Sequence, residues 1–98
     1  MSPKQAYDKI RRAINNDFEK NDKWSRRIFK KYKNKNKNFR VPEYEIFLNN
    51  DAYYSYKYAT EIIKRKLPEN MHNKMIGWSL ANDEFAKEYF HYIKQTQK

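Results

Sequence analysis

Apolar residues recur every three to four positions along most of the chain, which is the spacing of one face of an amphipathic helix. In the first segment these positions are Tyr7, Ile10, Ile14 and Phe18. Ser2 and Pro3 precede them, and this pair is typical of a helix start because serine caps a helix and proline fits its first turn. The pattern therefore predicts a helix that begins at Pro3.

The same spacing continues in a second segment, at Trp24, Ile28 and Tyr32. The asparagines near positions 15 and 21 interrupt the pattern only weakly, so residues 3–33 form either one long helix or two. From Lys33 to Asn38 lysine and asparagine alternate without an apolar residue. A stretch of this kind cannot pack against a core, and we expect an exposed loop.

The second half of the chain has clearer helix start and stop signals. A short helix is expected to open at Pro42-Glu43 and to reach Leu48. The cap cluster Asn49-Asn50-Asp51 should start another helix from about Ala52 to Lys66, which Leu67-Pro68 stops. The residues that this helix is expected to bury are Ala52, Ala59, Ile62 and Ile63.

Two further helices complete the prediction. One starts near Glu69, and its expected buried residues are Met71, Met75 and Ile76. The other is capped by Asn82-Asp83, and its apolar stripe consists of Phe85, Tyr89, Phe90 and Ile93. The expected fold is all-α, a small single-domain bundle of four to six helices over residues 1–98. Residues 1–40 form a basic helical arm with the Lys-Asn loop, and residues 41–98 form a neutral helical core.

The amino-acid composition supports a helical fold and indicates the cellular compartment. Gly77 is the single glycine, whereas sheets with tight hairpins usually need several. There is no cysteine, which excludes disulfides, thiol catalysis and cysteine-based zinc sites and fits a reducing compartment. No signal peptide and no apolar run of about 20 residues are visible, so we expect a cytoplasmic protein without a membrane partner.

One segment resembles a known repeat. It runs Asp51-Ala52-Tyr53-Tyr54-Ser55-Tyr56-Lys57-Tyr58-Ala59, continues with Ile62-Ile63-Lys64-Arg65, and ends with Leu67-Pro68-Glu69. This order resembles a tandem repeat of uncharacterised phage proteins, which reads Tyr-Ala-Tyr-x-Tyr-Ala, then Lys-Gly-Arg, then Pro-Glu. Lys64-Arg65-Lys66 lacks the glycine of the repeat, so its turn is expected to differ. The resemblance implies a helical unit and an origin in a mobile element, but no activity.

Positive charge is concentrated in the first part of the chain. The net charge is +10, and residues 1–40 alone carry fourteen lysines and arginines against four acids. The later residues are neutral, with eight of each sign. Between positions 23 and 40 there are nine cations and no acid: Lys23, Arg26, Arg27, Lys30, Lys31, Lys33, Lys35, Lys37 and Arg40. We call these nine residues the basic segment.

Cations that recur along a helix match the spacing of phosphates on a nucleic-acid backbone. The first hypothesis is therefore that the basic segment binds nucleic acid or a ribonucleoprotein. An acidic protein surface is the alternative partner, and a solvated face that only keeps the protein in solution would look the same. The chain length and charge leave the oligomeric state open.

Tyrosines gather in the neutral half, at Tyr53, Tyr54, Tyr56 and Tyr58. Four positions so close together surround a helix, so some of the rings are expected to be exposed. Exposed tyrosines are enriched at protein interfaces. These residues are therefore candidates for protein contact. They support the alternative function, a phage-encoded inhibitor of a host defence complex of the anti-CRISPR type.

The sequence offers few candidates for catalytic or metal-binding residues. His72 and His91 are the only histidines, and Glu88 with His91 would be one helical pair of metal ligands without a second pair. No nucleophile triad and no phosphate-binding glycine loop is present. The sequence predicts a binding protein that is not an enzyme and that has no catalytic residues, no metal site and no cofactor.

Overall fold

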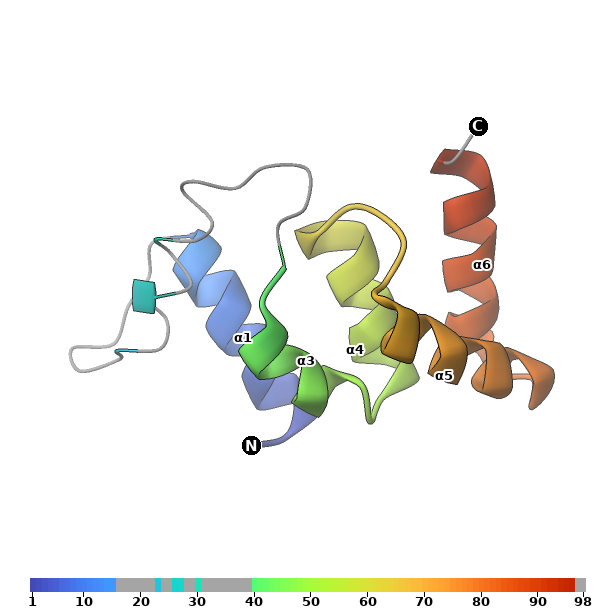
Figure 1. The fold of residues 1–98 in the computed structure, drawn as a ribbon, viewed down its shortest axis with the longest axis horizontal. Helices are drawn as coiled ribbons and strands as arrows, with labels where there is room; N and C mark the ends of the chain where they lie inside the picture. Colours follow the sequence, from blue (N-terminus) through green and yellow to red (C-terminus); the bar gives the residue numbers. More distant parts are fainter. Residues whose placement is uncertain (16–22, 24–25, 28–29, 31–39, 97–98) are drawn as a thin grey trace.

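The structure, a computed structural model, describes residues 1–15, 23, 26–27, 30 and 40–96 (Figure 1). Within these residues every regular element is helical. The elements are α1 (Pro3–Ile14), α3 (Pro42–Leu48), α4 (Ala52–Lys57), the π-helical segment η1 (Tyr58–Ile62), α5 (Glu69–Leu80) and α6 (Glu84–Thr96). The small all-α fold that the sequence predicts is confirmed.

Three of the helix starts carry the caps that the sequence predicts. The Ser2 hydroxyl accepts a hydrogen bond from the Gln5 N–H at 3.1 Å, and the Gln5 side chain accepts one from the Ser2 N–H at 2.8 Å. These reciprocal bonds are a capping box. Asp51 caps α4 through the N–H of Tyr54, and Asp83 caps α6 through the N–H of Ala86, both at 3.0 Å.

The first helix is short. It ends at Ile14, and Asn15 follows as its C-cap. One continuous helix over residues 3–33 is therefore excluded, and the interruption near Asn15 is the real helix end. The predicted apolar face at Trp24, Ile28 and Tyr32, and the predicted Lys-Asn loop, lie outside the described residues.

The helix expected to run from Ala52 to Lys66 ends earlier, which corrects that prediction. Its last turn is η1, and the N–H of Ile63 donates to the carbonyl of Tyr58 at 3.1 Å, five residues back. Lys64 then adopts a left-handed conformation with φ 53°, and the Arg65 N–H closes the turn on the Ala59 carbonyl. A left-handed residue just after the last turn is a common way to end a helix, although glycine usually fills it.

The core is centred on α4 and η1. Figure 1 shows α4 between the α1–α3 pair and the α5–α6 pair, and α4 contacts all four of these helices. The largest fully buried side chains come from every element of the bundle: Tyr58, Tyr89, Ile10, Leu48, Met75, Val41 and Ser55.

Predicted core positions are mostly correct. Ala52, Ala59, Ile62 and Ile63 are all at most 9% exposed. The predicted core residues of α5 include one error, because Met71 and Met75 are buried whereas Ile76 is 42% exposed. Ile76 follows Met75 directly, so its side chain points about 100° around the helix from that of Met75 and leaves the buried face. In α6, Tyr89 is fully buried and Phe90 and Ile93 pack half-buried on the core, but Phe85 is 36% exposed at its margin.

Candidate nucleic-acid interface

A groove of about 340 Å³ lies between α1 and α4. Its α1 side is formed by Tyr7, Asp8, Arg11 and Arg12, with Asn15 at the helix end. Its α4 side is formed by Tyr53, Tyr54 and Lys57. Residues four apart on a helix share a face, so each helix presents an aromatic ring and a cation together, Tyr7 with Arg11 and Tyr53 with Lys57.

The aromatic rings of the groove support one another. Tyr54 contacts Tyr7 with ring centroids 5.6 Å apart, and it meets Tyr53 edge to face at 4.8 Å. Tyr53 in turn meets Phe85 of α6 edge to face at 4.7 Å. Such edge-to-face pairs are favourable arrangements of aromatic rings. The two half-buried rings, Tyr53 and Tyr54, are therefore fixed by contacts from three helices.

Cations lie over these rings. The Lys57 ammonium is 5.5 Å from the ring centroids of both Tyr7 and Tyr53, and the Arg11 guanidinium is 5.9 Å from that of Tyr7. These distances are within the range of cation–π attraction. Positive charge is thus held beside one buried ring, Tyr7, and one half-buried ring, Tyr53.

One carboxylate beside the groove binds residues from both of its sides. Glu61 of η1 accepts a hydrogen bond from the Tyr7 hydroxyl and forms an ion pair with Lys57, with the ammonium nitrogen 3.3 Å from a carboxylate oxygen. The Tyr7 hydrogen bond, followed by the Lys57 charge, holds the pKa of Glu61 below its usual value. Burial and then the Glu61 hydrogen bond raise the pKa of Tyr7. Tyr7 therefore stays a neutral donor at physiological pH, and Glu61 stays charged.

The basic segment is described in part. Lys23, Arg26, Arg27 and Lys30 have a helical backbone and exposed side chains. The other predicted binding residues before position 40 lie outside the described residues: Lys31, Lys33, Lys35 and Lys37.

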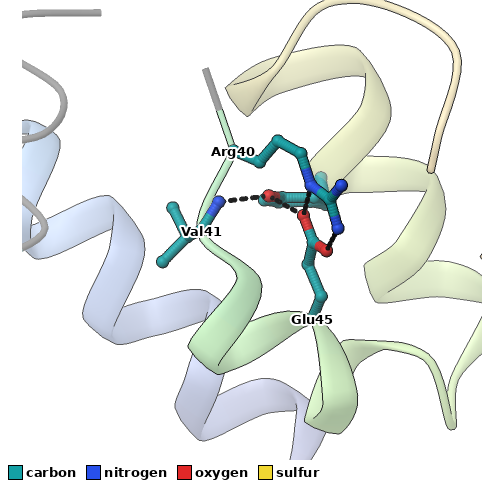
Figure 2. A network of polar contacts seen from close by, with 4 residues as sticks. Arg40, Val41 and Glu45 are labelled. Carbon is teal, nitrogen blue, oxygen red and sulfur yellow. Dashed lines mark hydrogen bonds and ion pairs between the residues drawn. The ribbon is translucent and has the colours of Figure 1, made fainter. Parts of the chain in front are cut away.

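Arg40 has a different environment from the one predicted. Figure 2 shows its guanidinium paired with Glu45 of α3 through two hydrogen bonds, at 2.5 Å and 3.1 Å. The same carboxylate accepts from the Tyr58 hydroxyl at 2.7 Å, and that hydroxyl accepts from the Val41 N–H at 2.8 Å. The Glu45 hydrogen bond raises the pKa of Arg40. Arg40 therefore neutralises a buried carboxylate, but its own side chain is 43% exposed, so its contact with a partner stays a prediction.

Tyr58, by contrast, is removed from the predicted contact residues. It is 0% exposed, and burial followed by the Glu45 charge raises its pKa. A side chain that binds Val41 and Glu45 in the core cannot touch a partner. Tyr53, Tyr54 and Tyr56 are half-buried and keep part of their surface in solvent.

The sequence analysis assigned the cations and the tyrosines to separate surfaces. It did not assign a binding role to the groove residues Tyr7, Arg11, Arg12 and Lys57. The available signal was the repeated pairing of an aromatic residue with a cation four positions later. The packing of α1 against α4, which brings the two pairs together, has no signature in the sequence.

Other chemistry is sparse in the described part of the chain. Residues 1–15 and 40–96, with the four isolated positions between them, contain no group of three metal-ligating side chains. The His72 Nδ1 atom lies 2.8 Å from the Tyr89 hydroxyl, which accepts from the Leu67 N–H at 2.9 Å. His72 thus has a structural partner in the core. None of the helices described is long and apolar enough to cross a membrane.

Comparison of the chain with protein-family models, with curated proteins and with solved structures finds no match.

Proposed function

We propose that this protein is a non-enzymatic binding protein that engages nucleic acid, free or within a ribonucleoprotein, through its basic N-terminal surface. The observation that carries the proposal is the groove that Arg11, Arg12 and Lys57 line together with Tyr53 and Tyr54. Proteins that hold single strands without sequence preference combine a positive groove with aromatic rings in this way. The excess of ten positive charges in residues 1–40 supports the same partner.

Electrostatics explains why this surface suits phosphates. Each phosphate that a cation neutralises releases counterions, and this makes affinity fall with salt. The exposed cations Lys23, Arg26, Arg27 and Lys30 add to those of the groove. Binding of this type reads backbone charge and carries no sequence code, because phosphate contacts are the same at every base.

The test is fluorescence anisotropy with labelled DNA and RNA over a range of salt concentrations. The arm variant Lys23→Gln/Arg26→Gln/Arg27→Gln/Lys30→Gln is expected to bind less tightly and to lose roughly one unit of salt slope for each phosphate contact removed. Its matched control is the core variant Lys64→Gln/Lys66→Gln/Lys74→Gln/Lys94→Gln, which loses the same charge from the neutral half. The core variant should retain most of the affinity.

Two results would contradict the proposal. The first is no binding of the wild type to any DNA or RNA at low salt. The second is an equal loss in the arm and core variants, which would mean that total charge alone attracts the probe.

A second candidate is a phage-encoded inhibitor that acts on a host defence complex by protein contact. The observation that favours it is an apolar pair on α5, where Ile76 is 42% and Leu80 82% exposed. Exposed apolar side chains one helical turn apart lie on the same helix face, where a protein partner can contact both. Capture of a host complex that survives nuclease treatment and is lost in Leu80→Glu would support this function. Capture that nuclease treatment abolishes would show that nucleic acid bridges the two proteins, and it would support the first proposal instead.

A further inference from the structure

We infer that the groove between α1 and α4 is a stacking subsite for one unpaired base of a single strand, with the flanking phosphates on Arg11 and Arg12. The inference rests on the proposed function and names its substrate class. The groove holds about 340 Å³, close to the lower limit of about 300 Å³ for small-molecule sites. This space suits one nucleotide unit. A base inside a duplex is stacked on both sides and offers no face to a protein ring.

The rings form a rigid platform. Tyr53 is held between Tyr54 and Phe85, and Tyr54 rests on Tyr7, so neither ring has to be ordered when a base arrives. Pre-ordered side chains lower the entropic penalty of binding. Every base has a π face, so the platform accepts any of them.

Lys57 occupies the position over the platform in the free protein. Its ammonium lies 5.5 Å from the Tyr53 and Tyr7 centroids and is held by Glu61, whose side chain is 45% exposed. An ion pair with so exposed a partner contributes only about 0–1 kcal/mol. The long lysine stem can therefore turn from the ring to a phosphate when a base takes its place.

The charges around the groove favour a nucleotide over other aromatic ligands. Arg11, Arg12 and Lys57 bring three positive charges, while Asp8 is the one acid among the groove-lining residues. Glu61, beside the groove, offsets the charge of Lys57 with which it pairs, so these five residues together carry one net positive charge. A cationic aromatic ligand would be repelled, and an acidic peptide would leave the rings unused. A base joined to phosphates uses both features.

The experiment compares two single strands of equal length and charge, one carrying bases and one abasic throughout. With the wild-type protein the base-carrying strand should bind roughly 5- to 150-fold more tightly, which is the contribution of stacking one base. This comparison needs no variant, so it is independent of folding defects. Equal affinity for the two strands would overturn the inference.

Variants locate the effect. Tyr53→Leu should remove most of the difference between the strands, whereas Tyr53→Phe should retain it because the ring remains. Tyr56→Leu is the matched control, since Tyr56 is also half-buried on α4 and touches Phe85 but does not line the groove. A Tyr53→Leu protein that folds and still discriminates the strands would refute the placement of the base.

The outcomes separate this inference from the proposed function. Loss of binding in the arm variant together with equal affinity for the two strands leaves nucleic-acid binding standing and removes the stacking subsite. No binding to either strand removes both. Displacement of the strand by a mononucleotide at equal concentration would assign the groove to a free nucleotide, and equal displacement by polyglutamate would assign it to an acidic protein; either result overturns the single-strand subsite.

Discussion

Glu45 shows how one residue joins the end of the basic segment to the core. Its side chain is 8% exposed and accepts hydrogen bonds from Arg40 and from Tyr58. Glu45→Gln turns one acceptor oxygen into a donor that faces these donors. We expect the free energy of unfolding to fall by about 1–3 kcal/mol, because a buried donor loses its partner. Urea denaturation measures the change.

The control for this prediction is Glu88→Gln, at an exposed position of α6. Such surface changes usually stay within about 0.5 kcal/mol. An equal, small effect of both substitutions would mean that the Arg40–Glu45–Tyr58 network does not stabilise the fold.

His72 makes stability depend on pH. Burial, and then the charge of Lys66, lowers the pKa of His72 in the folded protein. Between that lowered pKa and the unfolded value of about 6.5, the unfolded chain binds more protons than the folded one. Stability is therefore unaffected by His72 above pH 6.5, decreases as pH falls below it, and levels off below the folded pKa. His72→Gln should flatten this part of the curve of unfolding free energy against pH.

The end of the α4–η1 helix carries backbone strain that a single substitution can relieve. Lys64 has φ 53° just after the last turn, where a residue with a Cβ atom is disfavoured by about 1 kcal/mol. Lys64→Gly should raise the free energy of unfolding by up to about 1 kcal/mol in a thermal or urea titration. Lys66→Gly, at a residue without positive φ, should lower it slightly. Destabilisation by both glycines would show that the turn is not strained.

Some helix boundaries can be predicted from the sequence and others cannot. The difference is whether they depend on interactions between neighbouring residues or on packing between distant segments. The caps at Ser2, Asp51 and Asp83 act within three residues, so their helix starts could be predicted. The π-helical segment that ends at Ile62 begins at Tyr58, a residue buried in the core, whereas local spacing suggested four more residues of helix. Likewise Arg40 lies in a run of cations, and only the fold places it on Glu45.

At the scale of the whole molecule, the candidate site is a product of packing between distant segments. The Tyr7 and Tyr53 pairs are separated by more than forty residues and face each other only because α1 packs beside α4. Sequence reasoning recognised the cations and the tyrosines but had no means to predict this contact. It therefore predicted that the basic segment is the binding surface. Of that segment the structure describes only Lys23, Arg26, Arg27, Lys30 and Arg40.

The uneven distribution of charge predicts that the arm variant, which should bind nucleic acid less tightly, is more stable than the wild type. Ten excess positive charges within residues 1–40 repel one another, and this repulsion weakens as salt shortens the Debye length from about 10 Å at 0.1 M to about 3 Å at 1 M. Glutamine has a helix propensity close to that of lysine and arginine, so the arm variant changes charge more than helix preference.

The arm variant should therefore unfold at a higher urea concentration than the wild type in low salt, by a few tenths to about 1 kcal/mol, and the difference should vanish near 1 M salt. The core variant loses the same charge where acids and bases balance, so it should gain nothing. Stabilisation of the arm variant together with its loss of affinity would show that the cations serve binding at the expense of stability. An arm variant that is both less stable and unchanged in binding would instead assign these cations to the fold.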